Sequence, residues 1–161
     1  MKHIINIILL LAILIAVSCG NDEQCRKDRY VKMQLGIYHV TYNAVSKTRT
    51  VTYLSIDSLT AKGIGVDSIL YKNTKRISSI TLPLNKLDTV SKFQVTFNNI
   101  TDTVTILHTN YDTYLSLECG CIKTHTIDSV ITTNHFLDSV SISIHDVNTS
   151  TSAKEHIKLY N

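Results

Sequence analysis

The sequence predicts an all-β fold, an antiparallel β-sandwich, Ig-like or jelly-roll-like, of about eight to ten strands. Ser and Thr make up 35 of the 161 residues, and Thr, Ile and Val favour strands. Only 18% of the residues are charged, which argues against a helical bundle. No segment after residue 19 shows the 3.6-residue apolar repeat of an amphipathic helix. These three observations leave an all-β class as the expectation.

The expected strands follow one another along the whole chain after the N-terminal segment. Apolar and polar residues alternate with period two at residues 31–37, 93–97 and 140–144. Less regular strands are expected at residues 50–56, 65–71, 78–82, 103–108, 114–119, 126–131 and 156–160. The one proline, Pro83, stands where an edge strand or a bulge would tolerate it. The uneven strand lengths favour a sandwich over a barrel.

The N-terminal residues predict export. Residues 4–17 form an apolar run that would reach about 21 Å as a helix, short of the roughly 30 Å core of a bilayer. We therefore expect a signal-peptide helix and not a membrane span. The small residues before Cys19 resemble the lipobox of bacterial lipoproteins, in which that cysteine is acylated with chains such as palmitate. The alternative is an ordinary signal sequence in which Cys19 is incidental.

A polar segment at residues 20–24 follows Cys19 directly and favours the lipoprotein, because an anchored domain needs a tether. The resemblance implies a signal peptide at residues 1–18, a lipidated tether at residues 19–29 and one β-sandwich domain at residues 30–161. Acyl chains on Cys19 would hold the protein in the outer membrane of the cell envelope, facing the periplasm or the cell surface.

The remaining cysteines predict one disulfide and one free thiol in an oxidising compartment. Cys119 and Cys121 lie two apart in an expected strand, so their side chains point the same way and a bridge between them would be strained. Cys25 could reach either of them. We expect Cys25–Cys119, with Cys25–Cys121 as the alternative.

The same region carries a competing metal-site hypothesis. Cys119, Cys121, His125 and His135 offer thiolate and imidazole ligands that suit copper or zinc. A Cys-Gly-Cys motif with distant histidines is a weak signal beside paired Cys-x-x-Cys motifs, and a disulfide at Cys119 would remove one ligand. We expect no cofactor as the main interpretation and keep a metal-handling envelope protein as the alternative.

Aspartate is followed by Ser or Thr more often than composition predicts. Seven of the ten Asp residues precede Ser or Thr, and in six of these an aliphatic residue comes next. The pattern suits strand entries, because Asp and Ser form local hydrogen bonds at turns. It also resembles the acceptor motif of the protein O-glycosylation system of Bacteroidota. That resemblance implies six candidate hydroxyls: Ser58, Ser68, Thr89, Thr103, Ser129 and Ser139.

Several short motifs together resemble a family of Bacteroidota lipoproteins classed as a domain of unknown function. They are Cys19 with Cys25, the segment at residues 63–69, Leu82-Pro83-Leu84-Asn85, Cys119-Gly120 and the closing segment at residues 155–160. The resemblance implies an envelope lipoprotein with a β-rich domain and supports pairing Cys25 with Cys119. It brings no activity, and Cys121 departs from the single cysteine that the family has in the second half.

The function expected from these observations is a non-catalytic binding or structural module in the cell envelope. The sequence contains no GxSxG, HExxH, P-loop or dinucleotide-binding motif, so we expect no enzyme. A net charge of +3 is too small and too evenly spread to suggest nucleic-acid binding. Partners would be the membrane, through the lipid, and an envelope protein or glycan. Six tyrosines could form an exposed patch for such a partner, although aromatic residues in strands more often pack against the core: Tyr38, Tyr42, Tyr53, Tyr71, Tyr111 and Tyr114.

Overall fold

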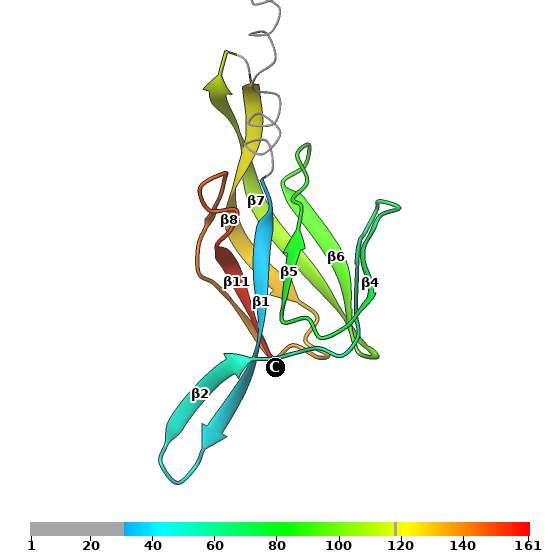
Figure 1. Ribbon diagram of the computed structural model, residues 1–161, viewed down its shortest axis with the longest axis vertical. Coiled ribbons are helices and arrows are strands. Elements are labelled where there is room, and N and C mark those ends of the chain that lie inside the picture. Colours follow the sequence, from blue (N-terminus) through cyan, green and yellow to red (C-terminus); the bar gives the residue numbers. More distant parts are fainter. Residues whose placement is uncertain (1–30, 118) are drawn as a thin grey trace, which may run out of the picture. The chain divides into compact units, whose positions relative to one another are not determined.

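Two β-sheets form the domain, with the hydrophobic core between them (Figure 1). The computed structural model describes residues 31–117 and 119–161. Within these residues the strands are β1 (Met33–Asn43), β2 (Thr48–Tyr53), β3 (Leu59–Gly63), β4 (Ile69–Thr74), β5 (Ser79–Leu82), β6 (Val90–Phe97), β7 (Ile100–Ser116), β8 (Gly120–Thr132), β9 (Ser139–Ile142), β10 (Asp146–Val147) and β11 (Glu155–Tyr160). No helix in the described part is long and apolar enough to cross a membrane. The predicted signal peptide, Cys19, Cys25 and the tether lie outside the described residues.

Antiparallel pairing dominates both sheets, so the predicted all-β sandwich is confirmed. The larger sheet runs in the order β10-β8-β7-β6-β3-β4 and is antiparallel throughout. The smaller sheet runs β2-β1-β11-β9, with β5 paired to the first part of β1. One pair is parallel: β1 lies beside β11, so the first and last described strands are neighbours.

The core follows from period-two alternation on the facing strands. In β6 the side chains of Phe93, Val95 and Phe97 are buried, and the residues between them are more exposed. The rings of Phe97 and Phe136 stack with their centroids 4.6 Å apart. Each such aromatic ring removes a large apolar area from water, at about 25 cal/mol per Å², so this alternation supplies the main driving force for packing the sheets.

Two predictions about strands were wrong in detail. No strand was expected at residues 59–63, but β3 lies there with Leu59, Ala61 and Gly63 buried. Two of these residues are small, so the alternation carries little hydrophobic signal. The predicted strands at residues 103–108 and 114–119 are one continuous strand, β7, which ends at Ser116. The polar residues between the two predictions lie on a hairpin that extends past the core.

Two hairpins extend beyond the sandwich (Figure 1). The first, here called the β1–β2 ribbon, comprises residues 38–53, and all six residues of β2 are exposed. The second, the β7–β8 arm, comprises residues 109–117 and 119–126 of the described chain. Four of the six tyrosines considered for a patch are exposed on these hairpins: Tyr42, Tyr53, Tyr111 and Tyr114.

Candidate functional site

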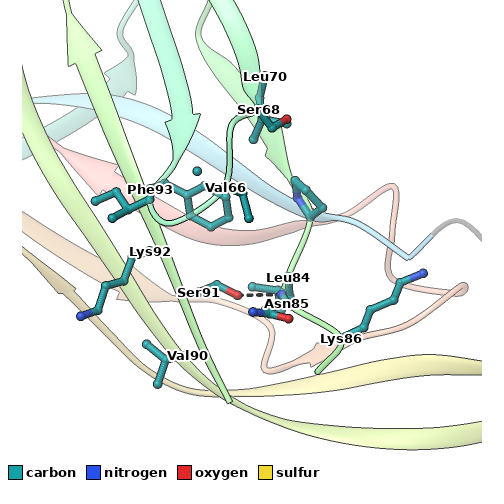
Figure 2. Close-up of a pocket in the computed structure, with 13 residues that line it drawn as sticks. Val66, Ser68, Leu70, Leu84, Asn85, Lys86, Val90, Ser91, Lys92 and Phe93 are labelled. Carbon is teal, nitrogen blue, oxygen red and sulfur yellow. Dashed lines mark hydrogen bonds between the residues drawn. The ribbon is translucent and has the colours of Figure 1, made fainter. Parts of the chain in front are cut away.

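A pocket of about 330 Å³ opens where β3 and β4, at one edge of the larger sheet, face the loop that follows β5 (Figure 2). Its size lies at the lower end of small-molecule sites. Most of the lining is apolar: Ile64, Val66, Leu70, Pro83, Leu84, Val90 and Phe93. The polar and charged lining residues are Ser68, Asn85, Lys86, Ser91 and Lys92. The pocket therefore combines an apolar body with a few hydrogen-bonding groups.

One wall of the pocket is the turn between β3 and β4. A Cβ atom at Gly63 would overlap the side chain of Val66, so glycine is required for the turn to fold back this closely. Gly65 has a positive φ of 85°, which glycine adopts without strain. The N–H of Ile64 donates to the carbonyl of Lys92 at 2.8 Å and fixes the turn against β6.

The opposite wall is the β5–β6 loop, which is held by the side chain of Ser91. The N–H of Asn85 donates to Ser91 Oγ at 2.8 Å, as the dashed line in Figure 2 shows. Ser91 Oγ in turn lies 2.8 Å from Nε2 of His108 on β7. Ser91 and His108 are 4% and 1% exposed. The pocket wall is thus connected to a buried polar group in the sheet behind it.

Asn110 extends this connection into a closed network. Its Oδ1 lies 2.9 Å from His108 Nδ1 and 2.6 Å from Nδ1 of His125 on β8. Its Nδ2 donates to the carbonyls of Asn85 and Asp88, at 3.2 and 2.9 Å. All four hydrogen-bonding positions of the amide are therefore used. We call Ser91, His108, Asn110 and His125 the histidine network.

The amide geometry sets the protonation of the two imidazoles. Asn110 Oδ1 only accepts hydrogen bonds, so Nδ1 carries the proton in both His108 and His125. Nε2 of neutral His108 then accepts from the Ser91 hydroxyl. Burial lowers the pKa of His108, and burial together with nearby positive groups lowers the pKa of His125 to about 4. Both rings are neutral at pH 7 and meet edge to face, with centroids 5.2 Å apart.

A second buried polar cluster lies on the same inward face of β7, at Asp102. This carboxylate is fully buried and accepts the N–H groups of His135, Phe136 and Leu137 at 2.7 to 2.9 Å. The hydroxyl of Thr133 donates to it at 2.7 Å. Burial opposes ionisation, but these donors prevail and lower the pKa of Asp102. We call Asp102 and the backbone it holds the carboxylate anchor.

The histidine network and the carboxylate anchor were not predicted from the sequence. The sequence patterns assigned no role to His108, and Asp102 entered them only as the residue before the candidate hydroxyl of Thr103. One sequence signal could have located both clusters: a polar residue at a position where the period-two alternation of a strand places side chains in the core. In β7 the buried positions are Asp102, Val104, Ile106 and His108.

The four predicted metal ligands are not brought together. Across the described residues, which include all four, no group of three or more His, Cys, Asp or Glu side chains is placed to hold a metal ion. His125 belongs to the histidine network, whereas His135 is exposed beside the carboxylate anchor and its Nδ1 lies 3.1 Å from Thr133 Oγ1. The two imidazoles therefore make their hydrogen bonds in separate clusters and do not face a common site.

The two cysteines near the tip of the β7–β8 arm differ from each other. Cys121 is an exposed free thiol. Cys119 is buried and disulfide-bonded, and its N–H donates to Ser116 Oγ at 3.0 Å. The alternative pairing through Cys121 is therefore not the arrangement in this structure. The predicted partner, Cys25, lies outside the described residues, so the Cys25–Cys119 pairing stays a prediction.

The six candidate glycosylation hydroxyls divide by exposure. Ser68, Thr89 and Ser139 are exposed, whereas Ser58, Thr103 and Ser129 are half-buried in or beside strands. The aspartates that precede the exposed three are themselves exposed, but Asp102, which precedes Thr103, is the carboxylate anchor. Ser68 also lines the pocket. Only the exposed three present both side chains of the motif to solvent.

Comparisons with known proteins place the described domain in a family without giving it an activity. No curated protein and no solved structure matches the chain. Residues 58–161 match the model of a family of unknown function, DUF6452. The matched range contains the pocket, the histidine network and the carboxylate anchor, and it begins after β2. The chain therefore belongs to the DUF6452 family of unknown function.

Proposed function

We propose that this protein is an outer-membrane lipoprotein of the cell envelope whose β-sandwich is a non-catalytic binding module. The observation that carries the binding role is the pocket between the β3–β4 turn and the β5–β6 loop. A mostly apolar pocket with a few convergent polar groups is the arrangement that binds small molecules. Its ligand would be an amphiphile that places an alkyl chain against Leu84 and Phe93 and a polar end near Asn85.

The histidine network supports a structural role for Ser91 over a nucleophilic one. The spacing of Ser91, His108 and Asn110 is similar to that of a hydrolase triad. However, Ser91 Oγ is buried and already accepts the N–H of Asn85. The N–H of Asn85 is consequently not free to donate to the oxyanion that forms during acyl transfer. The network is better suited to holding the β5–β6 loop at the pocket.

Binding of a simple amphiphile to the full chain tests the pocket. We expect octanoate or octyl glucoside to perturb the amide resonances of residues 63–68 and 83–93. Replacing Val66 at the pocket wall with Trp should weaken binding by about tenfold, because the indole fills the space. Val45→Trp, at a 97% exposed position in the β1–β2 turn, is the matched control. Unchanged binding by Val66→Trp, or no binding to the wild type, would refute the pocket as the site.

The covalent features of the proposal are tested on protein purified from its native envelope. We propose acylation at Cys19, a Cys25–Cys119 disulfide and O-glycosylation at one or more of Ser68, Thr89 and Ser139, whose exposed hydroxyls support access. Intact mass should exceed that of the polypeptide beginning at Cys19 by acyl and sugar increments. A mass equal to that bare polypeptide contradicts both modifications. Non-reducing peptide mapping should recover Cys25 linked to Cys119.

A further inference from the structure

The β1–β2 ribbon has an unpaired edge that the sandwich does not cover. In the described residues β2 ends the strand order of its sheet and pairs only with β1. Its sequence, TRTVTY, consists mostly of residues that favour strands, and it holds one charge, no proline and no bulge. Proteins normally protect a long, flat edge strand with charged side chains, prolines or bulges, because an open edge readily pairs with another strand.

The hydrogen-bond pattern shows which residues of β2 present this edge. The N–H of Leu54 donates to the carbonyl of Ile37 at 2.8 Å, which makes Tyr38 and Tyr53 a pair without direct hydrogen bonds to each other. Bonded and non-bonded pairs alternate along an antiparallel ladder. The N–H and C=O groups of Arg49, Val51 and Tyr53 therefore point away from β1.

The same three residues share one face of the ribbon. They pair with Tyr42, Val40 and Tyr38 respectively, and the other face carries mainly Thr side chains. Tyr42 and Tyr53 are each 63% exposed, and Val51 is 43% exposed. A two-stranded hairpin without a core beneath it is only marginally stable in water. The ribbon thus combines free backbone groups with an uncovered apolar face.

We propose that β2 pairs antiparallel with β2 of a second copy of this chain. A two-fold axis at Val51 places Val51 opposite its own copy and Arg49 opposite Tyr53 of the other chain, in both directions. All three outward-facing residues of each chain then form backbone hydrogen bonds. Arg49, whose guanidinium lies 5.7 Å from the ring centroid of Tyr160 in its own chain, is then opposite Tyr53 of the other copy, and Thr50 lies opposite Thr52. The sequence of the edge is therefore complementary to itself, and the smaller sheets of both copies become one continuous sheet.

Cysteine cross-linking in cells that express the full chain tests this register. In a Cys121→Ser background, Val51→Cys should give a disulfide-linked dimer on mild oxidation, because Cα atoms of a hydrogen-bonded pair lie about 5.5 Å apart. Val45→Cys, more exposed but outside β2, should give at least about tenfold less dimer. Arg49→Cys and Tyr53→Cys should cross-link only when the two variants are co-expressed.

A measurement without cysteine variants tests the association itself. The full chain purified in detergent should sediment as a dimer, and Val51→Asp should sediment as a monomer, because it places two carboxylates opposite each other in the pair. Val45→Asp, the matched control, should remain a dimer. A monomeric wild type, equal cross-linking of Val45→Cys and Val51→Cys, or cross-linking of Val51→Cys to a different protein would each overturn the proposal.

Discussion

The carboxylate anchor and the histidine network both hold a loop against the larger sheet, the first with a charged group and the second with neutral groups. Each lies on the inward face of β7, and each holds the backbone of a loop: residues 133–137 at Asp102, and residues 85–89 at Asn110 and its partners. The anchor is an ionised carboxylate that accepts several donors, whereas the network consists of neutral groups. The difference shows that a buried charge is tolerated where several hydrogen-bond donors converge on it. Where fewer donors are available, neutral imidazoles make the buried hydrogen bonds instead.

The two clusters should respond to acid in separate pH windows. The pKa of His125 in the folded protein, about 4, is below the ordinary value of 6.5, so the unfolded chain binds more protons between these values. Stability from the network is therefore complete above pH 6.5 and decreases as the pH falls towards 4. Asp102 also has a lowered pKa, but its ordinary value is 3.8, so its contribution is lost only below about pH 4.

Removing the carboxylate should have the largest effect. We expect Asp102→Ala to lower the free energy of unfolding by about 4 kcal/mol, because three backbone N–H groups and a hydroxyl lose their acceptor in a buried site. Urea denaturation followed by circular dichroism measures this loss. Asp138→Ala, at an exposed position, should change stability by less than about 0.5 kcal/mol. Equal effects at the two positions would contradict the anchor.

The pH dependence should distinguish the network from the anchor. Between pH 7 and pH 5 we expect proton uptake by His125 of the unfolded chain to lower the stability of the wild type by about 2 kcal/mol. His125→Gln retains an N–H donor without titrating in this range, so its loss of stability over this interval should be about 2 kcal/mol smaller than that of the wild type. His39→Gln, at an exposed histidine, should behave as the wild type does. The same slope in all three proteins would exclude the network as the cause.

Loss of the Ser91 hydroxyl should cost less than loss of the carboxylate. Ser91→Ala leaves the N–H of Asn85 and Nε2 of His108 without their partner, and both groups are neutral, so we expect destabilisation of about 1.5 kcal/mol. Thermal unfolding should show a lower midpoint, and proteolysis in the β5–β6 loop should become faster. Ser55→Ala, where the side chain is exposed, serves as the control. A variant as stable as the wild type would show that Ser91 does not hold the loop.

Removing an exposed ion pair between β7 and β8 should have the smallest effect on stability. Lys123 Nζ lies 2.8 Å from Asp112 Oδ2, with the two side chains 33% and 65% exposed. We expect Lys123→Ala to lower stability by about 0.3 kcal/mol, and 1 M NaCl to remove most of that difference. The anchor, shielded from salt by burial, should keep its effect at the same salt concentration. A salt-independent loss above 1 kcal/mol at Lys123 would contradict this ranking.

Sequence patterns predicted the strands better than the site. Alternation around Phe93 and Val140 correctly located β6 and β9, because period two follows directly from strand geometry. It identified which residues face inward, but not which strand lies opposite. His108 and His125 meet only because of the pairing between β7 and β8, which includes a register shift between Leu107 and His108. The sequence contains no local signal for that shift.

By itself the sequence determined the all-β class and the alternation of most strands, because these depend on neighbouring residues along the chain. The resemblances to lipoproteins and glycosylation acceptors also rest on such short segments. The tertiary structure decided the parallel pairing of β1 with β11, the pocket and the two buried polar clusters. These depend on hydrogen bonds and packing between residues far apart in sequence. An inward-facing Asp, Ser or His is stable only when its partners are supplied by another strand or loop.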